Sequence, residues 1–278
     1  QRLRTYVRSA SQNIRANIGQ RHRRDTLKLA QGNHLAASLF SLDEILIPPR
    51  LAAPPVIFQP EGVPPNDDII ELTIPYMPDC PELASAFNGH TLSLEEALSG
   101  GVNLALVGPP GSGKTTALGY LASQLARQKI ELTAPEEAIP ILVHASNLIQ
   151  LGEEDKLLAA IIKAVAVYSS PLSATRIPNF IQNTFANGQA FLLIDGLDEL
   201  PPDELTAVNN YIQEILSEYP ATRIVVAADA NHIGNLPNMG FASIPMAIWG
   251  TRQQAQFAKQ WGNVWSEYIE SNQDEEPD

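Results

Sequence analysis

The octapeptide Gly-Pro-Pro-Gly-Ser-Gly-Lys-Thr at residues 108–115 constrains the fold more than any other part of the chain. It fills every fixed position of the phosphate-binding pattern G-x-x-x-x-G-K-[ST]. The apolar run 104–107 before it predicts a short strand, and residues 116–125 after it place apolar side chains at helical spacing. A strand, a glycine-rich turn and a helix N-terminus together direct backbone N–H groups at an anion. This context favours a phosphate site over a chance glycine-rich turn.

The loop also assigns roles to its side chains. We expect the Lys114 ammonium to reach the β- and γ-phosphates of a nucleotide and the Thr115 hydroxyl to bind Mg²⁺. The predicted nucleotide contacts are Gly108, Pro109, Pro110, Gly111, Ser112, Gly113, Lys114, Thr115 and Thr116.

A second motif lies at residues 191–200. The four apolar residues 191–194 predict a strand that is buried on both faces, and the sequence Asp-Gly-Leu-Asp-Glu-Leu follows them. P-loop proteins hold Mg²⁺ through an acidic residue at the carboxyl end of such a strand. Asp195 is therefore a predicted metal ligand. For Asp198 and Glu199 a solvated acidic turn is an alternative interpretation.

The segments GPPGSGKTT and LLIDGLDEL together resemble the NACHT branch of the STAND signalling ATPases, which are related to the nucleotide-binding domains of NOD-like receptors. The resemblance covers residues 92–265 and is specific in these two motifs. In that family a small residue follows the Walker B Asp and two acidic residues lie further on, which here are Gly196, Asp198 and Glu199. Most AAA+ enzymes instead place a catalytic Glu directly after the Asp. The resemblance implies that Lys114 and either Asp198 or Glu199 are catalytic, the acidic residue by orienting or deprotonating water.

The chain departs from the family at one position. The strand after Walker B usually ends in a Thr/Ser-Arg pair whose Arg senses the γ-phosphate, but here it reads Ala227-Ala228-Asp229. A carboxylate cannot stabilise phosphate charge as a guanidinium does. Arg223 and Arg252 are weak candidates for the missing cation, so hydrolysis is in question.

The chain pattern predicts an α/β fold. We expect further strands at 139–145, 223–228 and 241–249, and helices at 154–168, 176–187, 203–218 and 251–269. Alternating strands and helices predict a P-loop NTPase with a parallel, doubly wound sheet. The family resemblance, rather than the spacing, implies the strand order 5-1-4-3-2.

Four regions are expected along the chain: an N-terminal helical segment 1–46, a Pro-rich linker packed on the core 47–91, a NACHT-like P-loop NTPase domain 92–270, and an acidic tail 271–278. Two helices are predicted in the first region, at 2–18 and 25–40, with a break at Gly32-Asn33. The capping-box sequence at 93–96 predicts a short helix before the first core strand. Because the chain starts at Gln1, we expect it to be a piece of a longer protein.

Two features have both a structural and a functional interpretation. His144 ends the strand 139–145 at the edge where the motifs meet, and a strand-ending cap is favoured over a catalytic role. Trp249, Phe257, Trp261 and Trp265 are interpreted as a packing stripe rather than a ligand platform, because three of them share helical spacing.

Composition narrows the choice of partners and compartment. Residues 1–50 hold nine Lys/Arg and three Asp/Glu, a net charge of +6. The whole chain has a net charge of −13, so the remaining residues carry −19. An acidic NTPase body disfavours nucleic acid as the main partner. The basic residues 21–24 could contact nucleic acid or a lipid headgroup, but a solvated helix is the commoner case. A single cysteine, Cys80, excludes an intrachain disulfide and favours the cytoplasm. No apolar stretch has the length of a membrane span.

The sequence therefore predicts a nucleotide-dependent signalling switch that binds Mg²⁺ and ATP and hydrolyses it slowly to ADP and phosphate. GTP and GDP are not excluded, although the guanine motif Asn/Thr-Lys-x-Asp is absent. The resemblance implies a homo-oligomer on activation, with effector and sensor domains outside this chain. Two alternatives belong to other classes: a nucleotide-binding oligomerisation scaffold without hydrolysis, which Asp229 favours, and an AAA+ motor, which needs an arginine finger and a basic channel.

Overall fold

The centre of the molecule is a five-stranded parallel sheet. The computed structural model describes residues 2–53, 91–130, 137–149 and 157–272. Its sheet contains β3 (Asn103–Val107), β4 (Ile139–His144), β5 (Ala190–Asp195), β6 (Arg223–Ala228) and β7 (Phe241–Pro245) in the order β4-β5-β6-β3-β7. When these strands are numbered along the chain from β3, the order is 5-1-4-3-2, which confirms the predicted fold. β7 ends at Pro245, short of the predicted residue 249, because the chain leaves the sheet after Met246 bridges to Leu51.

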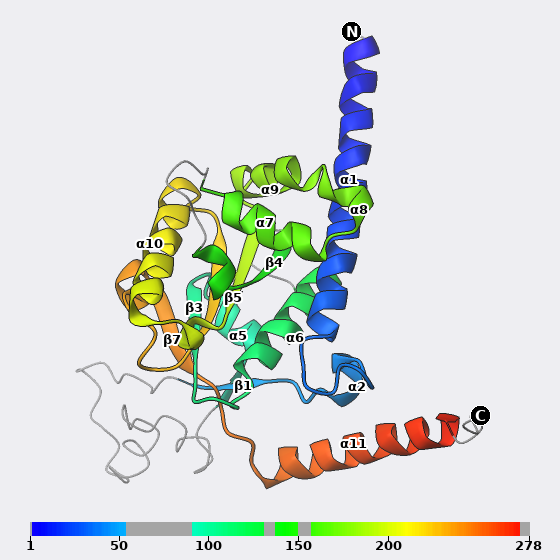
Figure 1. The fold of residues 1–278 in the computed structure, drawn as a ribbon, viewed down its shortest axis with the longest axis vertical. Helices are drawn as coiled ribbons and strands as arrows, with labels where there is room; N and C mark the ends of the chain where they lie inside the picture. The colour runs from blue at the N-terminus through cyan, green and yellow to red at the C-terminus, as the bar shows by residue number, and fades with distance from the viewer. Residues whose placement is uncertain (1, 54–90, 131–136, 150–156, 273–278) are drawn as a thin grey trace, which may run out of the picture.

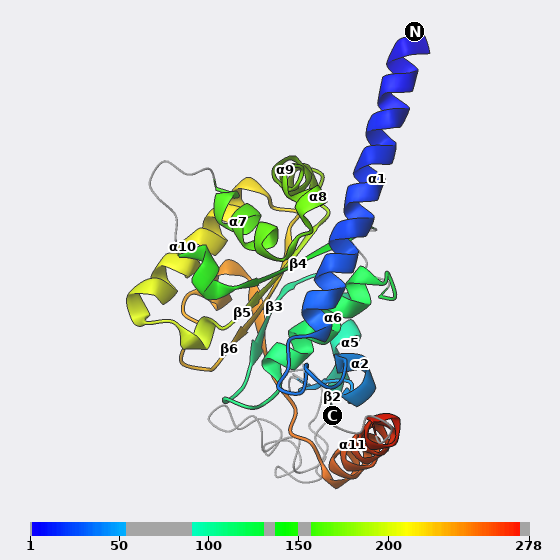
Figure 2. The same cartoon turned by 45° about the vertical axis from the view of Figure 1, so that its right-hand side comes forward.

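Helices cover both faces of the sheet (Figures 1 and 2). Successive strand residues point to opposite faces, so alternate side chains of one strand enter different cores. One core lies under α7 (Ala159–Tyr168), α9 (Ile177–Ala186) and α10 (Pro202–Glu218). The other lies under α5 (Leu94–Ser99), α6 (Lys114–Ala126) and part of α1. The predicted start of α7 at residue 154 lies outside the described residues. The short α8 (Pro171–Ala174) was not predicted.

The N-terminal segment differs from the prediction of two helices. A single helix, α1 (Arg2–Gln31), includes the residues between the two predicted segments, and only the short α2 (Leu42–Ile45) follows it. The predicted break is confirmed, because α1 ends directly before Gly32. The two-helix prediction was wrong because the buried stripe continues through polar residues: Ile18, His22, Thr26 and Ala30 are all buried at intervals of four. Figures 1 and 2 show the first half of α1 extending beyond the body, while the second half lies beside α6.

The segments on either side of residues 54–90 are paired. β1 (Arg50–Ala52) and β2 (Thr91–Ser93) are antiparallel, and Ile47 and Leu51 are buried. Most of the predicted Pro-rich linker lies outside the described residues. The predicted capping box is present, because the Glu96 N–H donates to Ser93 Oγ over 3.1 Å and the Ser93 N–H donates to Glu96 Oε2 over 2.6 Å. The resulting helix α5 leads into β3.

The last helix, α11 (Thr251–Asn272), runs along one end of the molecule and away from the sheet (Figure 1). The ring of Phe40 packs edge-on against Trp261, Trp265 and Tyr268, with centroid separations of 5.5, 6.2 and 5.8 Å. Phe257 contacts Trp249 and Trp261. The aromatic residues therefore form a packing stripe, as their spacing predicted.

Candidate nucleotide-binding site

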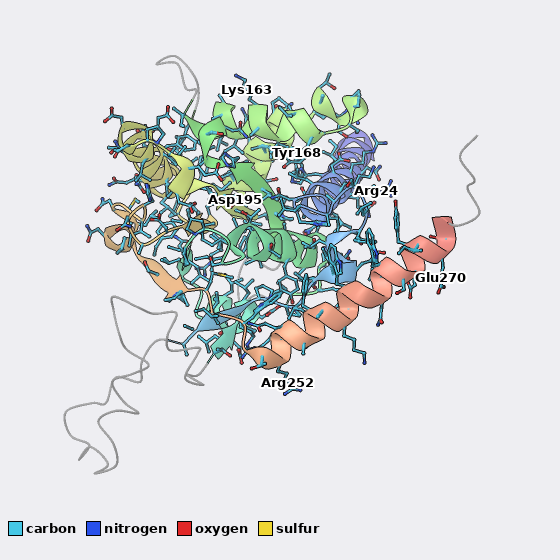
Figure 3. All side chains as sticks on the ribbon, turned by 60° about the horizontal axis from the view of Figure 1, so that its bottom comes forward. Arg24, Lys163, Tyr168, Asp195, Arg252 and Glu270 are labelled. Atoms are coloured by element: carbon cyan, nitrogen blue, oxygen red, sulfur yellow. The ribbon has the colours of Figure 1, made fainter. Side chains whose placement is uncertain are left out.

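The sheet order brings the two sequence motifs to the same edge. β3 runs directly into the loop 108–113, and β6 separates β3 from β5, at whose carboxyl end Asp195 lies. The Thr115 hydroxyl, in the first turn of α6, donates to Asp195 Oδ1 over 3.1 Å. Figure 3 shows Asp195 in the middle of the molecule, among side chains from several elements. The structure thus joins the residues that the sequence proposed as the two metal ligands.

The loop 108–113 needs its glycines. Gly111 and Gly113 have φ of +81° and +88°, in the left-handed region that other residues adopt only with strain. Gly108 leaves room for Ser112, because a Cβ at residue 108 would overlap the Ser112 hydroxyl. That hydroxyl is buried without a hydrogen-bond partner. α6 begins at Lys114, so its first N–H groups and the positive end of its dipole face the loop.

Lys114 is nearly buried and makes three polar contacts. Its Nζ donates to the carbonyls of Gly108 and Pro109 over 2.7 and 3.2 Å and pairs with Asp198 Oδ2 at 3.0 Å. The Lys114 side chain is 8% exposed and that of Asp198 is 15% exposed. An ion pair in such surroundings is stronger than one on the surface. Asp198 therefore lies beside the lysine of the phosphate loop, which the sequence alone did not specify.

Asp195 is a buried carboxylate with little compensation. Burial raises the pKa of the Asp195 carboxyl above its ordinary value, and the hydrogen bond from Thr115 only partly offsets this effect. A bound cation would supply the compensating positive charge. Thr115 and Asp195 offer the oxygen ligands that Mg²⁺ prefers. Among the described residues, no group of three or more His, Cys, Asp or Glu side chains could hold a metal ion by itself. A magnesium ion here would accordingly keep waters and phosphate oxygens as its other ligands.

The two acidic residues of η2 (Leu197–Glu199) have different surroundings. Asp198 contacts Lys114, whereas Glu199 Oε2 lies 3.3 Å from His144 Nε2 and its side chain is 70% exposed. His144 also accepts a hydrogen bond from the Ser146 backbone N–H and so begins η1 (Ala145–Leu148). The predicted strand-ending cap is confirmed, and the contact with Glu199 is an addition that the sequence pattern did not reveal.

Asp229 directly follows β6, as its strand position predicted. It lies next to the phosphate loop, because the Gly108 N–H donates to the Ala228 carbonyl over 3.2 Å. Its Oδ1 accepts bonds from the backbone N–H groups of Asn231 and His232 and from His232 Nδ1, over 2.7, 2.9 and 2.7 Å. Burial would raise the pKa of this carboxyl, but these bonds outweigh it and lower the pKa. Its charge is thus directed at its own loop, with a His232 partner that the sequence analysis missed.

Neither candidate for the missing sensor Arg reaches this edge. Arg223 begins β6 and therefore lies at the opposite edge of the sheet from Asp229. Its guanidinium lies beside Gly101, at the start of β3. Arg252 is in the first turn of α11, well apart from Asp195 (Figure 3). Both suggestions were wrong: Arg223 begins its strand instead of following it, and Arg252 belongs to α11, which runs away from the sheet (Figure 1).

Comparison with protein families adds an independent observation. The model of the NACHT domain matches residues 103–258, which is more than half of the chain and includes both motifs. The chain belongs to the NACHT family. It is thus a P-loop NTPase by family, in agreement with the sheet order and the loop geometry. A comparison with curated proteins found no match to this chain. Among the described helices of this NACHT protein, none has the length and apolar character required to cross a membrane.

Proposed function

We propose that this NACHT chain is a nucleotide-dependent signalling switch that binds Mg²⁺ and ATP and hydrolyses it slowly to ADP and phosphate. The observation that carries the proposal is the contact network at the carboxyl edge of the sheet, in which Lys114 meets Asp198 and Thr115 meets Asp195. A phosphate-binding loop and a buried carboxylate that accepts a hydrogen bond from the first turn of α6 suit a magnesium nucleotide.

We assign phosphate binding, magnesium binding and water orientation to different residues of the site. The N–H groups of the loop and the Lys114 ammonium would hold the phosphates, while Thr115 and Asp195, the latter through water, would hold Mg²⁺. When bound, the ion neutralises negative charge on the phosphates. For Lys114 to bind phosphate oxygens, its ammonium must turn away from Asp198. Asp198 then has a free carboxylate beside the phosphate loop and is the better placed of the two acidic residues to orient water.

The biological setting is proposed from the family. Closed and open forms would differ in their affinity for NDP and NTP, and copies of the chain would associate on activation, with effector and sensor domains supplied outside this chain. ATP is favoured over GTP because the guanine motif is absent from the sequence. A cytoplasmic location is consistent with the single cysteine.

The test combines binding with phosphate release. The purified chain is titrated with fluorescent ADP and ATP analogues in Mg²⁺, and phosphate release is then followed with unlabelled ATP. Lys114→Ala should weaken binding more than tenfold, since a lost charge-assisted contact costs about 1.5–3 kcal/mol. Lys259→Ala, an exposed change on α11, is the matched control. Equal affinity of the Lys114 variant and the wild type would contradict the site. Tight binding without phosphate release would favour the scaffold alternative, which mass measurements with and without ATP would examine further.

A further inference from the structure

The imidazole of His144 is held in one tautomer by its own turn. Its Nδ1 lies 2.8 Å from the Ser146 hydroxyl and 3.3 Å from the Ser146 backbone nitrogen. A backbone N–H can only donate, so Nδ1 must present its lone pair. The proton of the neutral ring is therefore on Nε2, which makes Nε2 a donor.

That donor faces the turn that follows Asp195. Nε2 of His144 lies 3.3 Å from Glu199 Oε2. The same nitrogen also lies so close to Gly196 that a Cβ at residue 196 would overlap it, and Gly196 has φ of +75°. The ring thus packs on the turn between the metal-binding carboxylate and η2, and the glycine gives it the space to do so.

The contact separates the two neighbouring carboxylates. In a 3₁₀ helix, adjacent residues project about 120° apart. Asp198 pairs with Lys114 at the start of α6, while Glu199 lies beside His144 at the end of β4. Leu197, the first residue of η2, is fully buried. A contact that restrains Glu199 therefore adds a second restraint on the rotation of η2, and with it on the direction of Asp198.

We propose that His144 is a positioning residue for nucleotide hydrolysis. Its Nε2–H holds Glu199, so that η2 presents Asp198 to Lys114 and to the water beside the γ-phosphate. The inference rests on the proposed function and deepens it, because it assigns Glu199 an anchoring role and Asp198 the contact with the reacting water.

Two variants separate this role from the strand-ending cap. His144→Gln keeps a donor amide at the reach of Nε2 but loses the acceptor for Ser146. His144→Asn keeps that acceptor but is too short to reach Glu199. We expect His144→Asn to lower kcat about tenfold, as small displacements of reacting groups do, with the nucleotide Kd unchanged. His144→Gln should stay within threefold of the wild-type kcat. The opposite ranking would show that the cap is what matters and would overturn the proposal.

A double-mutant cycle decides the case in which both variants slow turnover. In a Glu199→Ala background, His144→Asn should cause no further loss, because the contact is already gone. Additive losses would overturn the proposal. Glu199→Gln can still accept a hydrogen bond from Nε2 and should lose less turnover than Glu199→Ala, whereas a role as general base would make the two losses equal.

A spectroscopic measurement tests the contact without turnover. Imidazole ¹⁵N spectra of the full chain should show the His144 ring with its proton on Nε2, assigned by the signal that His144→Asn removes. Glu199→Ala should shift the Nε2 signal more than the Nδ1 signal. A proton on Nδ1, or an Nε2 signal that Glu199→Ala does not shift, would overturn the inference. This holds even for a chain that does not hydrolyse nucleotide. A wild type that shows the expected spectra but releases no phosphate would instead contradict the proposed function.

Discussion

At the scale of single residues, the pairing of Lys114 with Asp198 changes what a substitution should do. The Asp198 carboxylate competes with phosphate oxygens for the Lys114 ammonium, with which it pairs at 3.0 Å. Asp198→Asn keeps the side-chain shape but removes the charge. We expect nucleotide affinity to rise about fivefold, equivalent to about 1 kcal/mol, while turnover falls at least about tenfold because water loses its carboxylate partner.

Fluorescent ADP and ATP titrations, alongside phosphate release, check this expectation. Glu199→Gln is the matched control for binding, since Glu199 lies one residue away and contacts His144 rather than Lys114. Weaker binding by Asp198→Asn than by the wild type would mean that Asp198 supports the nucleotide instead of competing with it.

Asp195 should show a conflict between stability and function. Its carboxyl pKa is raised above the ordinary value, chiefly by burial, so folding disfavours its charged form. Stability is therefore lost as pH rises through the titration of this group. At neutral pH the ionised Asp195 carboxylate destabilises the folded state. Asp195→Asn should raise the unfolding midpoint in the absence of metal and nucleotide while it weakens Mg²⁺-dependent nucleotide binding. Thermal unfolding with EDTA, and nucleotide titration with and without Mg²⁺, measure the two effects. A lower midpoint in EDTA would show that the Thr115 contact outweighs the cost of burial.

At the scale of elements, the contact between α1 and the sheet depends on a buried histidine. His22 is almost fully buried, and its Nε2 lies 2.8 Å from the Pro140 carbonyl in β4. Burial lowers the His22 pKa to about 4, while the hydrogen bond to Pro140 raises it and the charge of Arg23 lowers it. The unfolded chain binds a proton near pH 6.5, but the native state does not until about pH 4. Stability should therefore fall as pH decreases from 6.5 to 4, by up to about 3 kcal/mol.

Urea unfolding at pH 7, 6 and 5 measures this loss. His22→Gln keeps a donor for the Pro140 carbonyl and removes the titration, so its stability should vary less with pH over this interval. Parallel curves for the wild type and the variant would contradict the assignment to His22.

The same helix shows which elements could be predicted from the sequence. The two motifs, the parallel sheet and most helix positions follow from apolar periodicity and fixed glycines, which are local properties of the chain. The strand order came from the family resemblance, since spacing does not encode it. The stripe of α1 was missed beyond Ile18 because His22 and Thr26 are polar, and their burial depends on partners such as Pro140, more than a hundred residues away.

The site was predictable to the same extent. Residues that a motif fixes, such as Lys114, Thr115 and Asp195, could be named in advance, because the chemistry of phosphate and magnesium dictates them. The partners of His144 and Asp229 could not, since they depend on the rotation of η2 and on the path of the loop after β6. Those are tertiary properties that one sequence does not display.

At the scale of the whole molecule, the basic N-terminal region makes polar contacts with α6. Arg23 donates to the Leu125 carbonyl at the end of α6 over 2.7 Å, and Arg127 pairs with Asp43. The first contact uses a basic side chain of α1 in the packing against α6, and the second joins an acidic residue of α2 to the C-terminal end of α6. They support the interpretation of this region as a structural helix rather than a nucleic-acid contact.

The docking of α1 on the helix of the phosphate loop links the N-terminal segment to the site. A Cβ at Gly119 in α6 would lie 3.2 Å from the Ala30 carbonyl, so the two helices approach closely where glycine allows it. The Gln31 amide also donates to the Ser123 hydroxyl over 2.9 Å. Because α6 begins at Lys114, movement of α6 would displace the first N–H groups of the phosphate loop.

Removal of α1 should therefore weaken both the fold and nucleotide binding. A chain lacking residues 1–31 loses the buried side chains from Ile18 to Ala30, whereas a chain lacking residues 1–16 keeps them and is the matched control. We expect the longer deletion to lower the urea midpoint and the nucleotide affinity together, and the shorter one to alter neither. Gly119→Val offers a test without truncation, since overpacking at a close contact costs about 1–3 kcal/mol. Unchanged nucleotide affinity in both the 1–31 deletion and Gly119→Val, with a lowered midpoint, would show that α1 stabilises the sheet without acting on the phosphate loop.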